Sequence, residues 1–479
     1  MNKKQLSPES FQRDTFSALN DPQLRRNFKR AMNGLMEKRQ AVFADVDEWQ
    51  QLRELGRSVR ANTLRKLPEL LEQLEVNCTK NGIQVHWAES IDEANALVLE
   101  IAQRHGVKGV VKGKSMVSEE MELNHFLEQH GIEALEADLG EYIIQVDHEL
   151  PSHIIMPAIH KNKEQISQMF HEKVDSGTLA ESAEEMTAIA RKVLRQKFYD
   201  ADMGVSGVNF AVAETGTLCL VENEGNGRFC TTLPPVHVAV MGIEKVIERL
   251  EDVPPLLSLL TRSATGQAIT TYFNMITSPR RSGEKDGPQE VHLILLDNGR
   301  SRMHSDELLQ ETLLCIRCGA CMNHCPVYSR IGGHAYNTTY PGPIGKILTP
   351  QMKGLHEAGH LADASSLCGA CVEVCPVKIP ITDILLRLRH DKVESKRKIS
   401  LAESGGIKAK TERLVWKGWA MVFANPEIYR LKSYGIAKMG NFTPGWLPIL
   451  RKWTSVRSKP RFAKKNLHQL VREEGLRDE

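Results

Sequence analysis

The sequence predicts an α/β domain built on a parallel sheet over residues 71–298, preceded by a helical N-terminal layer over residues 1–70. A helical, cysteine-rich domain is expected over residues 299–390, followed by a basic C-terminal tail over residues 391–479. Three observations support this division. Strands alternate with helices in the second segment, seven of the ten cysteines fall in the third, and positive charge gathers in the fourth.

The composition is that of an ordinary globular protein. The chain has 479 residues, of which 41% are hydrophobic and 25% charged, so wholesale disorder and a fibrous repeat are excluded. No apolar run approaches the ~20 residues that span a bilayer. The first ten residues lack the apolar core of a secretory signal. We therefore expect a soluble protein that stays in the cytoplasm.

The first two segments differ in their hydrophobic period. Residues 1–70 have apolar positions at helical spacing with many charges, and nothing in them indicates chemistry. Residues 71–298 alternate short β-branched runs with helical patterns, which implies a parallel sheet covered on both faces. The expected strands are 83–87, 107–112, 132–135, 143–146, 218–221, 236–241 and 291–296, and the expected helices are 91–104, 119–129 and one with the capping-box spacing of Ser182 and Glu185.

The first cysteine motif occupies residues 315–326 and reads CIRCGACMNHCP. Its spacing, C-x2-C-x2-C-x3-C-P, is the bacterial ferredoxin run that binds a [4Fe–4S] cluster. Three of its cysteines hold one cluster, and the fourth, which precedes proline, ligates the other cluster. Because thiols in a cytosolic chain stay reduced, such clustered cysteines indicate metal ligands before disulfides.

The second motif, CGACVEVCP at residues 368–376, has one cysteine fewer than the first. The second cluster therefore has only three thiolates. Its fourth iron either has a ligand other than cysteine or is missing, which would leave a [3Fe–4S] centre, and the sequence leaves both alternatives open. Under the crossing rule, iron of the first cluster is bound by Cys315, Cys318, Cys321 and Cys375, and iron of the second by Cys325, Cys368 and Cys371.

Structural zinc is the alternative to iron and sulfide. A zinc site takes four ligands, commonly as two CxxC pairs. Three cysteines at steps of three, two Cys-Pro endings and an odd total fit that pattern poorly. We therefore expect two iron–sulfur clusters, with [4Fe–4S] the favoured type. The wide separation of the motifs and the helical spacing of apolar residues over 381–388 favour a helical ferredoxin fold.

Candidate site residues outside the cysteine motifs carry weaker signals. The run GVVKGKS at 109–115 has three residues between its glycines, where a Walker A loop needs four. It is either an anion-holding turn at a helix start or a tight turn with an exposed lysine. Glu214 lies between two apolar runs and is the one candidate catalytic residue, since a buried carboxylate is costly unless paired. Its alternative role is that of a hydrogen-bonded turn residue.

Other polar residues could flank the same cleft as Glu214. They are the turn-rich loop over residues 222–228 and two histidines, His153 and His160, each of which is more often structural when it stands alone. No GxGxxG run follows a strand, so flavin or nicotinamide binding has no sequence signal. An iron–sulfur protein without its own hydride carrier is expected to relay electrons to or from a partner.

The C-terminal tail is strongly basic, and after Val393 its sequence pattern is irregular. From residue 387 onward there are 22 lysines and arginines against 9 acidic residues, although the whole chain carries only +2. The tail is a solvated arm, a docking element for an acidic partner or a peripheral contact with an anionic membrane. Four tryptophans within it favour docking. A nucleic-acid partner is not expected, because no recognition-helix motif is present.

These residues together resemble the lactate-utilisation protein B family, the iron–sulfur subunit of a three-protein bacterial system. The resemblance covers nearly the whole chain and implies a sheet of the sugar-isomerase and CoA-transferase type. It also implies a cytoplasmic role in oxidising L-lactate to pyruvate beside two partner lactate-utilisation proteins, and the seven cysteines match the family's cluster ligands. The segments that carry it are VVKGKSMVSEE (110–120), EADLGEYIIQ (136–145), PSHIIMPAIHK (151–161), AETGT (213–217) and YPGPIG (340–345).

Two functions of different classes follow from these patterns. The first is an electron-transfer subunit of a complex that oxidises L-lactate and allows growth on it. The second is a transferase-like enzyme in the α/β domain that uses Glu214, with structural or redox-sensing clusters. The immediate electron acceptor has no signal in the sequence.

Overall fold

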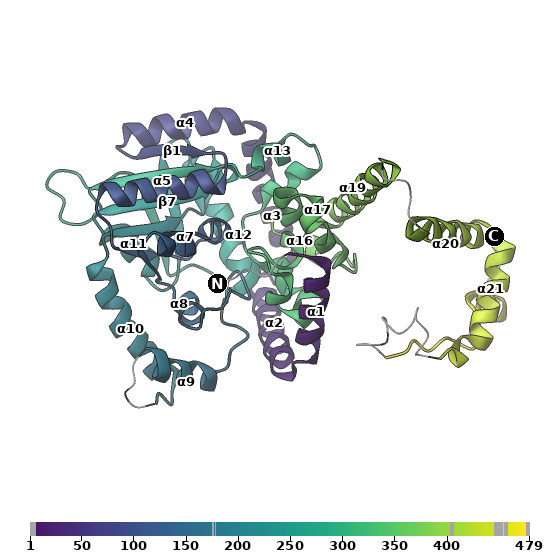
Figure 1. The fold of residues 1–479 in the computed structure, drawn as a ribbon. Coiled ribbons are helices and arrows are strands. Elements are labelled where there is room, and N and C mark those ends of the chain that lie inside the picture. Colours follow the sequence, from purple (N-terminus) through teal and green to yellow (C-terminus); the bar gives the residue numbers. More distant parts are fainter. Residues whose placement is uncertain are drawn as a thin grey trace. The chain divides into compact units, whose positions relative to one another are not determined.

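The computed structural model describes residues 6–174, 177, 179–402, 407–444, 454 and 458–475. The chain forms two compact units, Met1–Asp391 and Lys392–Glu479. The first unit holds the sheet and both cysteine motifs, and Figure 1 labels some of the elements of each unit.

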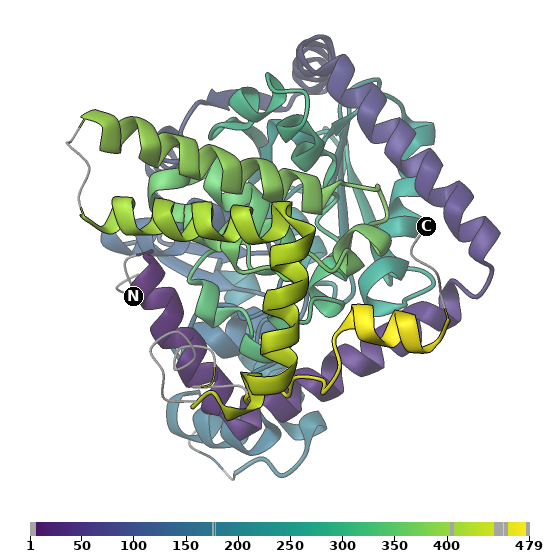
Figure 2. The same cartoon turned by 90° about the vertical axis from the view of Figure 1, so that its right-hand side faces the viewer.

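Four helices begin the first unit. The second of them is capped by Asp21, whose carboxylate accepts the backbone N–H groups of Gln23 and Leu24, and it has Pro22 at its first position. Figures 1 and 2 show the first two helices beside the cysteine-rich part of the unit, which they contact. The helices are α1 (Pro8–Asn20), α2 (Pro22–Val42), α3 (Val46–Arg65) and α4 (Leu67–Lys80).

The centre of the first unit is a six-stranded sheet in the order β1-β10-β7-β4-β2-β3. Every neighbouring pair in it is parallel, which confirms the predicted parallel-sheet α/β domain. Non-consecutive neighbours require crossovers, and helices supply most of them. The strands are β1 (Gln84–Ala88), β2 (Gly109–Lys112), β3 (Glu133–Glu136), β4 (Met203–Gly207), β7 (Val236–Gly242) and β10 (Glu290–Leu296).

Both faces of this sheet are covered. Along β7, Val238 and Val240 pack in one hydrophobic cluster with α5 and α7, while Ala239 and Met241 pack in another with α3 and α4. Alternate side chains of a strand point to opposite faces, so a strand covered on both sides is apolar throughout. Besides α3 and α4, the helices of the α/β part are α5 (Ile91–Arg104), α6 (Met116–Glu120), α7 (Leu123–Gln129), α8 (Leu139–Val146), α9 (Lys163–Lys173), α10 (Ala183–Asp200), α11 (Asn226–Thr232) and α12 (Val253–Thr265).

A second, four-stranded sheet was not expected from the sequence. Its order is β8-β5-β6-β9, and its β6 includes the segment 218–221 that the alternation pattern assigned to the parallel sheet. The tight β5–β6 turn, in which Gly216 has a φ of 64°, folds the chain back into an antiparallel pair. The strands are β5 (Phe210–Val212), β6 (Thr217–Glu222), β8 (Val246–Ile247) and β9 (Tyr272–Ile276).

Two local predictions in the α/β domain were wrong. Residues 143–146 belong to α8 and not to a strand, because Asp138 caps a helix there and Tyr142 and Ile143 share its buried face. The helix expected over 119–129 is broken at Glu122, which has a φ of 54°. Elsewhere the predicted cap at Ser182 is present, but Glu185 accepts the N–H of Glu181 in place of closing a capping box.

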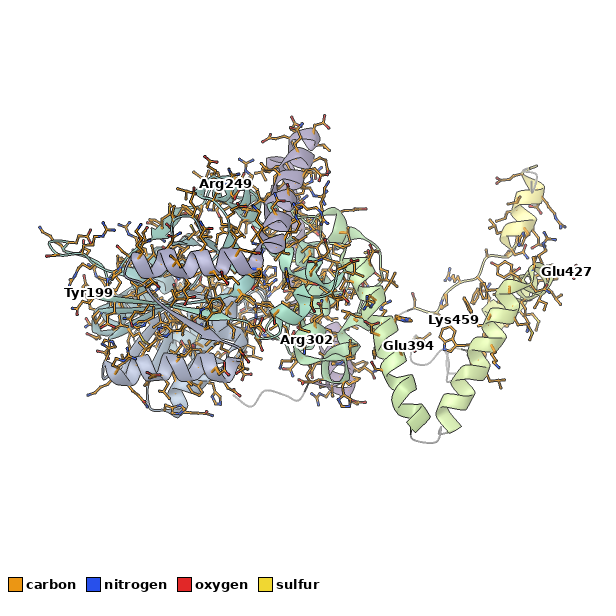
Figure 3. The ribbon with its side chains drawn as sticks, turned by 90° about the horizontal axis from the view of Figure 1, so that it is seen from above. Tyr199, Arg249, Arg302, Glu394, Glu427 and Lys459 are labelled. Atoms are coloured by element: carbon orange, nitrogen blue, oxygen red, sulfur yellow. The ribbon has the colours of Figure 1, made fainter. Side chains whose placement is uncertain are left out.

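The cysteine-rich part is built of short helices that share one core with the sheet. Arg302, labelled in Figure 3, ties α13 to the end of α16 by donating to the carbonyl of Gln351. A buried apolar stripe on α19 confirms the helical spacing read over residues 381–388. The helices are α13 (Arg300–His304), α14 (Ala320–Asn323), α15 (Tyr328–Ile331), α16 (Gly342–Lys353), α17 (Leu355–Ala358), α18 (Ala370–Glu373) and α19 (Ile381–Ala402).

The C-terminal unit is helical, whereas the sequence indicated an irregular tail. Its helices present many large apolar side chains to solvent, including Trp416 and Trp419. The other two tryptophans of the tail, Trp446 and Trp453, lie outside the described residues. Within the part of the chain that is described, no helix is long and apolar enough to cross a membrane. The helices are α20 (Ile407–Ala424), α21 (Pro426–Met439) and α23 (Leu467–Glu473).

The β5–β6 turn generates a stability prediction. A Cβ on Gly216 would stand 2.7 Å from the backbone of Asn77 and Cys78 in α4, in addition to the strain of its positive φ. Gly131 has a similar φ of 77° with nothing within 4 Å of an added Cβ, so Gly131→Ala is the matched control. We expect the control to lose about 1–2 kcal/mol of unfolding free energy from conformation alone. Gly216→Ala should lose clearly more in chemical denaturation, and equal losses would show that the turn is not held against α4.

Candidate iron–sulfur centre

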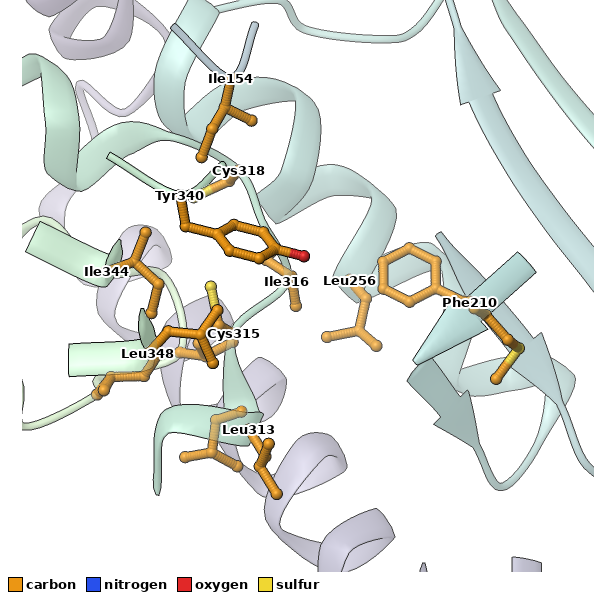
Figure 4. Close-up of a cluster of buried hydrophobic side chains, with 14 of the residues drawn as sticks. Ile154, Phe210, Leu256, Leu313, Cys315, Ile316, Cys318, Tyr340, Ile344 and Leu348 are labelled. Carbon is orange, nitrogen blue, oxygen red and sulfur yellow. The ribbon is translucent and has the colours of Figure 1, made fainter. Parts of the chain in front are cut away.

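Four cysteines from two distant parts of the sequence line one small, largely enclosed cavity. Cys315, Cys318 and Cys321 come from the first motif and Cys375 from the end of the second. Apolar side chains complete the wall, and Figure 4 shows Cys315 and Cys318 among them with Ile154 and Ile344 nearby. The fold therefore brings Cys375 to the first three cysteines of the other motif.

Backbone N–H groups in and beside both motifs point at sulfur. The Arg317 N–H donates to Cys315 Sγ at 3.4 Å, and the Ile379 N–H donates to Cys375 Sγ at 3.4 Å. Gly319 follows in a left-handed conformation with a φ of 83°, and a Cβ there would stand 3.0 Å from Ile155. N–H donors of this kind are among the features that tune cluster potentials.

Burial and mutual repulsion set the charge state of these thiols. Burial, followed by the charge of Cys315, raises the pKa of Cys318, and burial raises the pKa of Cys375 to about 11. Cys321 is raised in the same way, first by burial and then by the neighbouring thiols. Thiols in such a place become thiolates only when a bound cation compensates their charge. The donor set therefore fits a group that contains metal, and four sulfur donors in this spacing fit iron and sulfide.

A second set of cysteines lies beside a buried lysine. Lys346 of α16 is 1% exposed, and its Nζ lies 3.5 Å from Cys325 Sγ. Burial and then the charge of Cys325 raise the pKa of Cys371 to about 11, while Lys346 opposes that rise. Cys368 is the exposed member of this set. One edge of the second set therefore reaches solvent, whereas the first set is mostly buried.

Arginines from the N-terminal helices surround the first set, although the sequence analysis assigned them no chemistry. Arg53 Nε donates to the carbonyl of Cys375 at 2.9 Å. Arg60, 1% exposed, donates to the carbonyls of Leu313 and Leu314 just before Cys315. These cations offset the negative charge that thiolates bring into the interior. The sequence does contain a signal for these residues, because arginines at positions 53, 57 and 60 recur at helical spacing on one face of α3.

A larger cavity of about 320 Å³ lies next to the first cysteine set. It opens beyond the carboxyl ends of β2 and β4, the edge of a parallel sheet at which α/β proteins bind ligands. Its wall includes Cys318 and three cationic residues, Lys114, Lys245 and Arg317. Burial, followed by the charge of Arg317, lowers the pKa of Lys245 to about 7. Three carboxylates, Asp138, Glu222 and Glu224, also line the cavity, so it presents charges of both signs beside the first cysteine set.

Buried ion pairs fix this wall. Arg300 donates to Glu244 and, through both terminal nitrogens, to Glu120. Arg317 lies 3.3 Å from the other oxygen of Glu244. Burial alone would raise the pKa of Glu244, but Arg300 and Arg317 lower it to about 2. The guanidinium group of Arg317 is thus held between the sheet and the cavity.

The structure separates the candidate residues of the α/β domain. The turn over 109–115 contributes Gly113, Lys114 and Ser115 to the cavity, and the loop over 222–228 contributes Glu222 and Glu224. Lys114 Nζ donates to the Ile155 carbonyl at 3.0 Å and lies 3.5 Å from Glu141. These two segments therefore share one cavity.

The other three candidates do not line this cavity. Glu214 is an exposed turn residue whose carboxylate accepts the Leu250 N–H at 3.1 Å. His153 is buried against the Asn323 side chain, and burial lowers its pKa to about 4. His160 contacts Glu149 at 2.6 Å.

A parallel α/β sheet that shares its core with a doubled cysteine motif defines an iron–sulfur protein. Comparison with known proteins agrees part by part. The LUD domain model matches residues 71–296, the 4Fe-4S dicluster domain model matches residues 311–379, and the model named Lactate utilisation protein B, C-terminal, matches residues 387–476.

Similar proteins cover almost the whole chain. Lactate utilization protein B of Bacillus pumilus is 41% identical over 463 residues, covering 95% of each chain. The proteins of the same name from Shouchella clausii and Bacillus cereus strain AH820 are each 42% identical, covering 96% and 95% of each chain. The chain belongs to the lactate utilisation protein B family.

One solved structure also shows similarity. The crystal structure of a DUF162 family protein from Deinococcus radiodurans is 14% identical and covers 48% of this chain and 98% of its own, with a TM-score of 0.28. That similarity is too low to bear on the fold.

The buried lysine generates a redox prediction. Removing its positive charge disfavours the added electron on reduction, so Lys346→Met should lower the midpoint potential of one iron–sulfur centre. We expect a shift of about 60 mV, the equivalent of ~1.4 kcal/mol for a one-electron couple. Redox titration followed by EPR measures it. Lys353→Met is the matched control, since Lys353 lies on the same helix with a side chain that is 49% exposed. Equal shifts in both variants would contradict a specific role for Lys346.

Proposed function

We propose that the protein is the iron–sulfur electron-transfer subunit of a cytoplasmic complex that oxidises L-lactate to pyruvate. The observation that carries the proposal is the position of the two cysteine sets. The first set stands at the wall of a cavity with three cationic residues, and the second set reaches solvent at Cys368. Electron transfer from a bound small anion to a partner protein needs one cluster beside the anion and another cluster near the protein surface.

We infer the ligands from the same arrangement. Cys315, Cys318, Cys321 and Cys375 hold the first cluster, which is supported by their shared cavity. Cys325, Cys368 and Cys371 hold the second, which is supported by the effect of the Cys325 and Cys368 charges on the pKa of Cys371. Two clusters, with the first of the [4Fe–4S] type, agree with the spacing of the motifs.

In this function, the residues around the cavity and the first cysteine set bind the substrate, transfer its protons and exclude water. Oxidation of lactate to pyruvate releases two electrons and two protons, and bound iron–sulfur clusters supply one-electron carriers for the electrons. Lys114, Lys245 and Arg317 attract the carboxylate of a small acid toward Cys318. Lys245, with a pKa of about 7, can take up or release a proton at its Nζ in the same cavity. The apolar wall around the first cysteines keeps water from them.

The chain's partners are proposed to be the two other lactate-utilisation proteins of the same system. Large apolar side chains on α20, among them Trp416, Trp419 and Phe423, are more than half exposed and would be covered by a partner. Aromatic residues of this kind anchor interface centres. Nucleic acid is not among the proposed partners, and contact with an anionic membrane is the alternative use of the basic tail.

We further infer that the six-stranded sheet is related to the sugar-isomerase and CoA-transferase type, which its parallel order and doubly covered faces support. A transferase reaction at Glu214 has no such support. Glu214 is exposed in a turn and its carboxylate is occupied by a backbone N–H.

The function is tested by adding L-lactate anaerobically to the cluster-loaded chain. With both partner proteins present, the visible absorption of the clusters should bleach as they are reduced. The chain alone should stay oxidised, since its sequence carries no signal for a hydride carrier, and D-lactate serves as the control substrate. A chain ending at Asp391 should keep its iron and lose the response if the C-terminal unit is the docking element. No bleaching in the complete mixture would contradict the proposed role.

The ligand sets are tested separately by single replacements. Cys321→Ala and Cys375→Ala should disturb the same spectroscopic centre, and Cys325→Ala and Cys368→Ala should disturb the other. The protein purified anaerobically should carry about seven to eight irons, resolved into the two centres by EPR of the reduced state. If Cys321 and Cys325 affect one centre in common, each motif holds its own cluster. Stoichiometric zinc with little iron would exclude clusters altogether.

A further inference from the structure

The two cysteine motifs are copies of one backbone segment at an offset of fifty residues. The last three cysteines of the first motif correspond to the three of the second, so the position of Cys315 corresponds to Ser365. The residue in the place of the eighth cysteine is therefore a serine. The corresponding pairs are Cys315 and Ser365, Cys318 and Cys368, Cys321 and Cys371, and Cys325 and Cys375.

The copy extends to the backbone conformation. Arg317 and Leu367 occupy equivalent positions and have φ values of 60° and 55°, which is rare for residues with side chains. Gly319 and Gly369 follow at 83° and 82°. A four-residue helix then begins in each motif, α14 in the first and α18 in the second. Two segments that repeat such uncommon angles direct their equivalent side chains in the same way.

The hydrogen bond that positions the first ligand is also repeated. In the first motif the Arg317 N–H donates to Cys315 Sγ at 3.4 Å. In the second motif the Leu367 N–H donates to Ser365 Oγ at 3.2 Å. The distance from N to Oγ is shorter than the distance from N to Sγ because oxygen is a smaller acceptor atom than sulfur. The hydroxyl oxygen therefore stands where the first motif has a sulfur ligand.

An arginine holds the chain that leads into each motif. Arg60 binds the carbonyls of the two residues before Cys315. Arg389 of α19 donates to the Ala362 carbonyl at 2.9 Å and to the Ser365 carbonyl at 3.0 Å. Ser365 is thus fixed by its carbonyl as well as by its side chain, as a preorganised ligand is.

We propose that Ser365 Oγ is the fourth protein ligand of the second cluster and that this cluster retains four irons. Ligation replaces the O–H bond by a bond from oxygen to iron, and the proton leaves to solvent, which the half-buried Ser365 and the exposed Cys368 can reach. Lys346 is a poorer candidate, because its ammonium group has no lone pair and lies over the Tyr336 ring.

The proposal rests on the inferred ligand set of Cys325, Cys368 and Cys371 and not on lactate. Its test needs neither substrate nor partner, so failure of the electron-transfer role would leave it standing. The same test distinguishes a fourth ligand other than cysteine from a missing fourth iron, the two alternatives that the sequence left open for the second cluster. The fourth iron has an oxygen ligand and is not missing.

The test compares iron content and spectra of three variants with the wild-type full-length chain, all loaded with ⁵⁷Fe under anaerobic conditions. The wild type should contain four irons in the second cluster, one of them with Mössbauer parameters of mixed sulfur and oxygen ligation. Ser365→Ala should lose one iron per chain and show the EPR signal of an oxidised [3Fe–4S] centre. Ser365→Cys should keep all irons, with the distinct iron becoming like its thiolate-bound neighbours.

Ser366→Ala is the matched control, since it removes the adjacent hydroxyl, which bonds to Cys368, and should keep full iron content. The Ser365→Cys variant guards against misfolding, because a serine with only a structural role would not yield a spectroscopic change confined to one iron. Full iron content and EPR silence of oxidised Ser365→Ala would overturn the proposal. A [3Fe–4S] signal already present in the oxidised wild type would overturn it as well.

Discussion

Placing seven cysteine sulfurs in and around a protein core is the constraint on which the rest of this structure depends. Isolated buried thiolates are costly, and burial together with repulsion from neighbouring thiolates raises the pKa of Cys318 and Cys321. Buried cations and backbone N–H groups that point at sulfur stabilise the negative charge of the thiolates. Apart from Arg317, these cations come from outside the cysteine motifs, from α2 and α3 on one side and from α16 on the other. The N-terminal helices therefore cover the sheet and also supply positive charge to the cysteine sets.

The same constraint explains why the sheet and the cysteine motifs meet where they do. Arg317 stands between two cysteines, yet its guanidinium group pairs with Glu244 beyond the end of β7. Glu244 is shared with Arg300, which in turn holds Glu120. A chain of alternating buried charges therefore links the carboxyl edge of the sheet to the motif loop. Breaking such a pair from one side leaves an uncompensated charge, at a cost of about 3–5 kcal/mol.

Spacing and period in the sequence predicted much of this architecture. The cysteine intervals indicated iron and sulfide, and the bounds expected for α5 agree with the structure because a serine cap and a clear apolar stripe mark them. Residues 143–146 were misread because a short β-branched run does not distinguish a strand from a buried helix. The second sheet was not predicted because β5 pairs with β8, and β6 with β9, across long sequence separations that periodicity does not record.

The candidate site was predictable only where its signal was local. Seven cysteines could be read from spacing, but the arginines of α3 look like an ordinary solvated face until the packing is seen. Ser365 was overlooked because a motif is usually read from its first cysteine, whereas the register of the repeat is set by its last. The helices α20, α21 and α23 of the tail could not be predicted, because charged residues obscure their apolar periodicity.

The hydrogen bonds of Arg60 have a consequence for how this family can vary. This single guanidinium group, on an N-terminal helix, donates to carbonyls of Glu244 and Val246 in the α/β part and of Leu313 and Leu314 in the cysteine-rich part. The matched LUD and dicluster segments are therefore not independent structural units, and the protein cannot be divided at their boundaries. A cysteine-rich segment moved by itself into another protein would lose the Arg60 donor to the Leu313 and Leu314 carbonyls. Recombination within the first unit is expected to be tolerated only when all three segments move together.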